Sequence, residues 1–103
     1  MKIIKCIVED IREEAEGAEH YAKMATKFRD EDRALADCYA KMAETEIGHV
    51  NTLHEHAVRL IKAKKSTGAE VPSTMQAIWD WEHGKMVDCM ARVKALLSMY
   101  RGQ

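Results

Sequence analysis

Residues 39–57, "YAKMAETEIGHVNTLHEHA", decide how this chain is interpreted. The stretch has the composition and the three- and four-residue apolar spacing of a long amphipathic helix. Between Met42 and Val50, however, Glu46 occupies a place where that spacing calls for an apolar side chain. His49 follows three residues later, so a carboxylate and an imidazole project from neighbouring turns on the apolar side of one helix.

Two stretches of the sequence interrupt the helical pattern. The first is "KFRDED", residues 27–32, where Asp30 is a candidate N-cap for the helix that follows. The second is "KKSTGAEVPSTMQ", residues 64–76, which contains a glycine and a proline. In it Ser73 and Gln76 have the spacing of a capping box that opens a new helix.

The rest of the chain predicts three long helices, at about residues 2–28, 31–65 and 73–101, and no strand. At about 1.5 Å per residue, each helix is about 40–50 Å long. We therefore expect the 103 residues to form one all-α domain, a long antiparallel hairpin with a third long helix. A chain of this size buries a small core, and such chains often gain stability from a metal or from oligomerisation.

Each expected helix carries an apolar stripe when traced at about 100° per residue. The stripe residues are Ile3, Ile7, Ile11, Ala18, Tyr21, Ala25 and Phe28 in the first helix, Leu35, Tyr39, Met42, Val50, Leu53, Ala57 and Leu60 in the second, and Met75, Trp79, Met86, Met90, Val93, Leu97 and Tyr100 in the third. Glu14 interrupts the first stripe and Glu46 the second. Both glutamates lie within about 20° of the centre of their apolar faces, so we expect them to point into the core.

A turn centred near residue 30 places Glu14 opposite Glu46. Two buried carboxylates at one level repel each other and lose hydration, at several kcal/mol per ion unless a cation lies between them. No lysine or arginine lies on either stripe near that level, whereas His49 offers a nitrogen ligand. The pattern therefore favours a metal site for iron, manganese or zinc. A protonated carboxylate pair, or a different hairpin register, is the alternative.

Composition argues against several other classes of protein. The net charge is −1 with 32% charged residues, which gives no reason to expect nucleic acid or an anionic membrane as a partner. The first residues turn acidic too soon for a signal peptide, and no apolar run has membrane-spanning length. Cys6, Cys38 and Cys89 are widely spaced and form no CxxC, so we expect neither a disulfide framework nor a zinc ribbon, and a cytoplasmic location.

The segments "EEAEGAEHYAKMA", residues 13–25, and "LADCYAKMAETEIGHV", residues 35–50, resemble the ferritin-like superfamily. That superfamily carries one Glu on the first helix of a hairpin and ExxH on the second. Within it the chain resembles the encapsulated ferritins, short chains with a single such hairpin, over residues 9–60. The resemblance implies a ferritin-like four-helix bundle completed by dimerisation, and oxidation of Fe(II) at a di-iron centre between subunits.

The resemblance also assigns roles to single residues. Glu14 matches the carboxylate of the first helix, and Glu46 and His49 match the ExxH pair, so all three are expected metal ligands and catalytic residues. Tyr21 matches a tyrosine often found near such a centre, and with Tyr39 it is a candidate for tuning the site from behind the ligands. Both tyrosines are more simply explained as core residues with a hydrogen-bonded tip.

Glu13 and Glu16 fall where encapsulated ferritins place acidic residues that attract incoming metal. An ordinary solvated helix face explains these two glutamates as well.

The third helix departs from the family pattern. It supplies no second Glu and ExxH, no rubredoxin-like cysteine cluster follows it, and encapsulated ferritins have a short helix and a targeting tail there. A turn near residue 69 brings Glu82 level with His56 and His83 level with Glu55, about 13–15 Å from Glu46 along the axis. His56, Glu82 and His83 are therefore a candidate minor site, separate from the main one.

The missing ligands are instead expected from a second copy of the chain. Two hairpins related by a two-fold axis bring together six ligands, enough for two metal ions. We therefore expect a homo-oligomer, at least a dimer, and iron storage would need a larger assembly or an outer shell protein. Trp81 either marks another interface or leans on a neighbouring helix, and His20 and His54 are expected in solvent.

Two other functions stay open at this point. The helices could form an oligomeric structural or interaction protein, including a phage-associated one, with a structural metal or none. Alternatively the chain could bind metal as a sensor or chaperone without turning it over.

Overall fold

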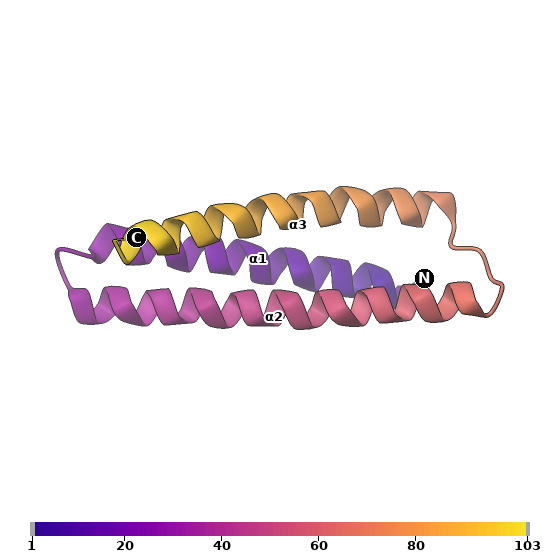
Figure 1. Ribbon diagram of the computed structural model, residues 1–103, viewed down its shortest axis with the longest axis horizontal. Helices are drawn as coiled ribbons and strands as arrows, with labels where there is room; N and C mark the ends of the chain where they lie inside the picture. Colours follow the sequence, from indigo (N-terminus) through magenta and orange to yellow (C-terminus); the bar gives the residue numbers. More distant parts are fainter. Residues whose placement is uncertain (1, 103) are drawn as a thin grey trace.

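A computed structural model describes residues 2–102 and consists of three long helices (Figure 1). These are α1 (Lys2–Phe28), α2 (Arg33–Ser66) and α3 (Ser73–Tyr100). The molecule is elongated, 56 Å long and 21 × 17 Å across. No strand occurs in the described part, so the all-α prediction is confirmed.

The helices α1 and α2 form an antiparallel hairpin, and α3 runs back along it, parallel to α1 (Figure 1). The C-terminal end of α3 lies beside the α1–α2 turn, and the connection from α2 to α3 lies at the opposite end of the molecule. α3 packs mainly against α1 and makes few contacts with α2. One side of the α1–α2 hairpin is therefore covered by α3 and the other side is open.

The start of α2 differs from the prediction by two residues. Asp32, not Asp30, is the N-cap, and its carboxylate accepts a hydrogen bond of 3.0 Å from the amide of Leu35. The reason is that α1 ends in an extra turn, in which the amides of Glu31 and Asp32 both donate to the carbonyl of Phe28. That turn leaves Asp32 as the first acidic residue free to cap α2.

The predicted capping box at the start of α3 is wrong. Pro72 is the N-cap, no side chain caps this helix, and Ser73 is already its first residue. The side-chain amide of Gln76 donates forward to Asp80 over 2.9 Å instead of back to the cap. Gly68, just after α2, has a φ of +80°, the left-handed conformation in which a helix often ends at glycine.

The core is built on small residues of α1 and α2 at alternating spacings of four and three. We call these residues the covered stripes: Ile4, Val8, Ile11, Ala15, Ala18, Ala22 and Ala25 on α1, and Ala36, Ala40, Ala43, Ile47, Val50, His54, Ala57 and Ile61 on α2. All are buried except Ile47 and His54, which are half-buried. The alanines let the helix backbones approach closely, and α3 fills the remaining space.

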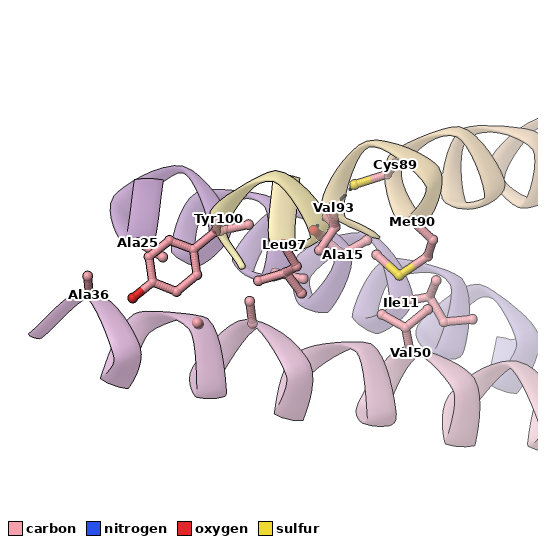
Figure 2. Packing of buried hydrophobic residues seen from close by; sticks show 14 residues of the cluster. Ile11, Ala15, Ala25, Ala36, Val50, Cys89, Met90, Val93, Leu97 and Tyr100 are labelled. Carbon is pink, nitrogen blue, oxygen red and sulfur yellow. Dashed lines mark hydrogen bonds between the residues drawn. The ribbon is translucent and has the colours of Figure 1, made fainter. Parts of the chain in front are cut away.

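The C-terminal half of α3 adds large side chains to the core. Met90, Val93, Leu97 and Tyr100 are 0–7% exposed and point onto the hairpin, in agreement with the predicted stripe of this helix (Figure 2). The hydroxyl of Tyr100 donates a hydrogen bond to the carboxylate of Asp37, which ties the end of α3 to the start of α2.

A second pair of stripes runs one residue before the first on each helix. We call these the open stripes: Ile3, Ile7, Asp10, Glu14, Gly17, Tyr21, Met24 and Phe28 on α1, and Leu35, Tyr39, Met42, Glu46, His49, Leu53, His56 and Leu60 on α2. Every member is half-buried or exposed. The predicted stripes mixed the two sets, and Ile3, Leu35 and Met42, predicted in the core, are 54%, 40% and 37% exposed.

Residues 2–102 contain no helix with the length and continuous apolar character that a bilayer-spanning segment needs. The three cysteines are free, as the sequence predicted. Cys6 and Cys38 are exposed. Cys89 is buried and its thiol donates to the carbonyl of Ala15 over 3.3 Å, as the dashed line in Figure 2 shows. Burial raises the pKa of this thiol, so Cys89 acts as a packed core residue.

Candidate metal centre

Glu14 of α1 and Glu46 and His49 of α2 converge on the open side of the hairpin. The Nδ1 atom of His49 lies 3.3 Å from Glu14 Oε2 and 3.6 Å from Glu46 Oε1. One ligand atom from each of the three residues lies within 4.8 Å of the other two. It is the one group of three or more His, Cys, Asp or Glu ligands gathered this closely within residues 2–102. The predicted opposition of Glu14 and Glu46 is present in the structure.

A glycine lies beneath this arrangement. Gly17 lies one turn after Glu14 on the open stripe, and the carboxylate of Glu46 lies over it. A Cβ atom at Gly17 would stand 3.5 Å from Glu46 Oε2, at van der Waals contact. The Glu46 carboxylate therefore lies across α1 at Gly17, where a methyl group would touch it without displacing it.

The three side chains are half-buried or exposed, not buried. Their exposed fractions are 33% for Glu14, 21% for Glu46 and 53% for His49, and no polar or charged residue among the described ones is buried. The prediction that both carboxylates point into the core is therefore wrong for the single chain. The physical reason is that α3 covers the neighbouring stripes, so these residues line the uncovered side of the hairpin.

The charges at this centre have no basic partner within the described residues. Neither Glu14 nor Glu46 pairs with a lysine or arginine, and the only side chain that meets them both is His49. Two carboxylates and one imidazole are a donor set that iron, manganese and zinc accept. Three ligands are fewer than the four to six that these ions take, so water or further side chains would fill the remaining coordination positions.

The two tyrosines lie further along the open stripes, beside each other. The rings of Tyr21 and Tyr39 stack at 6.1 Å between centroids, and Phe28 stacks on Tyr39 at 6.3 Å. Neither hydroxyl hydrogen-bonds to Glu14 or Glu46, or to His49, within the part of the chain that is described. They border the centre on the side of the α1–α2 turn as an aromatic group.

The two glutamates proposed for metal uptake lie on different sides of α1. Both Glu13 and Glu16 are exposed. Glu16 lines a groove of about 290 Å³ between α1 and α3, together with Glu19 and Arg92. It therefore faces away from the open stripes, and only Glu13 stays next to the centre.

The candidate minor site of His56, Glu82 and His83 is not assembled. His83 packs instead on His54, with ring centroids 5.1 Å apart, while His56 lies 3.3 Å from Arg59. Glu82 faces Arg12 of α1 at 4.0 Å and Lys85 at 3.8 Å. The predicted pairing of α2 with α3 was one residue out, since His83 lies against His54 and not level with Glu55, and α3 takes its register mainly from α1.

Sequence reasoning placed His54 in solvent, whereas the structure places it on the covered stripe of α2. Burial and the nearby His83 lower its pKa, and Glu55 opposes that shift. Its spacing of four after Val50 and three before Ala57 was the signal that could have located it. Trp81, predicted either to mark an interface or to lean on a neighbouring helix, is 69% exposed.

Comparisons with known proteins identify no relative of this chain. No protein-family model, no curated protein and no solved structure matches it.

Proposed function

We propose that the chain is a ferritin-like metal-binding protein that oxidises Fe(II) at a di-iron site shared between two copies. The observation that carries the proposal is the convergence of Glu14, Glu46 and His49 within 4.8 Å, with no lysine or arginine among the described residues to neutralise the carboxylates. One Glu from one helix and a Glu-x-x-His pair from the next is the half-set of ligands that a ferritin-like bundle uses.

Two features support a second copy on the open side. The first is the ligand count, because two half-sets provide six ligands for two ions. The second is the apolar part of the open stripes, where Ile3, Leu35 and Met42 are 37–54% exposed on both sides of the carboxylates. Helices with two adjacent apolar stripes are suited to packing on two sides, and α3 occupies one side only.

The residues of the chain would act on iron mainly by binding and by excluding water. Ionised Glu14 and Glu46 supply two negative charges from each copy, and the lone pair of His49 supplies a nitrogen. Met42 and Leu53, on either side of the ligands along α2, would close over the site when a second copy covers it. Iron bound there supplies one electron per Fe(II) ion, so a pair of ions reduces dioxygen or peroxide by two electrons.

The direct test is anaerobic Fe(II) titration of the size-separated oligomer, followed by a pulse of oxygen and near-ultraviolet absorbance. We expect about one iron per chain and then ferric absorbance that reappears with each fresh load of Fe(II). Glu46→Gln should lose both signals. The matched control is Glu55→Gln, an exposed glutamate on the same helix, which should keep both.

Each other outcome selects a different function. If no iron binds and the oligomer is unchanged in Glu46→Gln, the proposal is wrong and the interaction-protein interpretation replaces it. If iron binds once and is not turned over, the centre is a metal-binding site without ferroxidase activity.

A further inference from the structure

Two imidazoles meet where α3 reaches α2, away from the open stripes. His54 of α2 and His83 of α3 have ring centroids 5.1 Å apart and planes inclined by 30°. The Trp79 ring lies 5.8 Å from His54 and 5.7 Å from His83 by the same measure, so three rings pack together. Both histidines are half-buried. The group is thus part of the contact between two helices.

The nitrogens of these two rings have no partner in the protein. Neither His54 nor His83 makes a hydrogen bond or an ion pair with any of residues 2–102. Polar groups of half-buried side chains are normally hydrogen-bonded, to protein or to water. The lowered pKa of His54 leaves its ring neutral at pH 7, with one nitrogen lone pair available.

We infer that His54 and His83 form a two-histidine site for a divalent transition metal such as Zn²⁺, Ni²⁺ or Cu²⁺, which joins α2 to α3. A metal–nitrogen bond is about 2.0–2.1 Å, and the imidazole centre lies about 1.1 Å behind the nitrogen. Two imidazoles on one tetrahedral ion therefore have centres about 5 Å apart. The observed separation of 5.1 Å matches that distance.

The surroundings set the strength of this site. No third His, Cys, Asp or Glu ligand joins the pair among the described residues, so water would complete the coordination and the affinity would be modest. The site is independent of the candidate metal centre, because His54 belongs to the covered stripe of α2 and His49 to the open one. A metal here would stabilise the packing of α3, which otherwise makes few contacts with α2.

The test uses the full chain with the first centre removed by Glu14→Gln, Glu46→Gln and His49→Gln. In this variant ZnSO₄ or NiSO₄ is titrated and Tm is measured. We expect Tm to rise by about 4–8 °C when the metal reaches about five times its dissociation constant. Adding His54→Gln or His83→Gln should abolish the rise. Adding His56→Gln, an exposed histidine on the same helix, should leave it unchanged.

A second measurement covers the case in which a histidine variant does not fold. Cu²⁺ should quench the fluorescence of Trp79, which touches both rings, in a Trp81→Phe form of the same variant. Absence of both the Tm rise and the quenching would overturn the inference, as would a Tm rise that survives His83→Gln. Because the first centre is already removed, none of these results depends on the proposed ferroxidase function.

Discussion

The covered and open stripes of the α1–α2 hairpin differ in composition although they lie one residue apart on the same helices. The covered stripes combine alanines with branched apolar residues and one histidine, and almost all of them are buried. The open stripes combine large apolar side chains with three carboxylates and two imidazoles, and all of them are half-buried or exposed. The side covered by α3 therefore stabilises the single chain. The open side carries the candidate metal ligands and apolar side chains that α3 does not cover.

This difference separates stability from function within one hairpin. Burial of the covered stripes under α3 removes apolar surface from water within the chain, and that is the main source of folding free energy. The open stripes leave much of their apolar surface in solvent, so a single chain gains less from them. Substitutions on the two sides should therefore affect different measurements.

The largest effect should follow from truncating a large side chain on the covered side. Leu97 is 3% exposed and packs from α3 onto the hairpin (Figure 2). Leu97→Ala should lower the free energy of unfolding by about 2–5 kcal/mol, because it removes apolar contacts and leaves a cavity. Urea unfolding followed by circular dichroism measures the change.

The matched control is Met99→Ala, two residues along the same helix. Met99 is 63% exposed, so this variant should change stability by less than about 0.5 kcal/mol. Equal losses in the two variants would mean that α3 does not bury the face described here.

On the open side, a charge should affect association more than folding. Met42→Lys places an ammonium group in the apolar part of the open stripe of α2, where Met42 is 37% exposed. We expect self-association to weaken by about tenfold or more, while the stability of the monomer changes by less than about 0.5 kcal/mol. Analytical ultracentrifugation over a concentration series measures the association constant.

Asn51→Lys adds the same charge to an exposed position about 180° round α2 from Met42 and should leave association unchanged. If Met42→Lys associates as well as the unaltered chain does, the open stripes are not where the second copy binds.

The sequence was sufficient for the features that depend on local spacing. The three helices lie within two residues of the predicted bounds, since long apolar periodicity and the breaks near residues 30 and 70 are local signals. The pairing of Glu14 with Glu46 also followed, because a short turn fixes the register of an antiparallel hairpin.

The features that depend on α3 did not follow from the sequence. Two stripes offset by one residue both have alternating spacings of four and three, so periodicity alone cannot decide which one is covered. That choice is made by the packing of α3, and it exposes Ile3 and Met42 and half-buries His54. The connection over residues 67–72 sets no register by itself, which is why His83 meets His54 and not His56.

Two glycines within helices allow a smaller test of how the open side differs from the rest of the hairpin. Gly17 faces Glu46 on the open side, whereas a Cβ atom at Gly48 would meet nothing within 4 Å. Replacement of either by alanine should raise the stability of the metal-free chain by about 0.5–1 kcal/mol, because alanine favours a helix interior over glycine. Thermal unfolding measures this gain.

Metal binding should separate the two alanine variants. The new methyl group in Gly17→Ala touches the Glu46 carboxylate at 3.5 Å and limits its movement, so the Tm rise that Fe(II) causes under anaerobic conditions should be smaller. Gly48→Ala should keep the full rise. If both keep it, the carboxylate does not need the space above Gly17.

The smallest effect should come from the polar edge of the covered side, where α3 meets α1. Arg92 Nε donates to Glu19 Oε2 over 2.6 Å, and this hydrogen bond lowers the pKa of Glu19 below its ordinary value of 4.5. A lowered carboxyl pKa means that the unfolded chain binds the proton more readily. The stabilisation is therefore complete above pH 4.5 and is lost as the pH falls through the lower pKa of the folded state.

Arg92→Gln should accordingly cost less than about 1 kcal/mol at pH 7, since the pair is partly solvated. The gap in unfolding free energy between Arg92→Gln and the unaltered chain should narrow as the pH falls below 4.5 and through the lowered pKa of Glu19 in the folded state. Lys94→Gln, at an exposed position two residues further along, serves as the control and should show no such convergence. A gap that stays constant from pH 7 to about pH 3 would show that Arg92 acts through the packing of its methylene groups and not through Glu19.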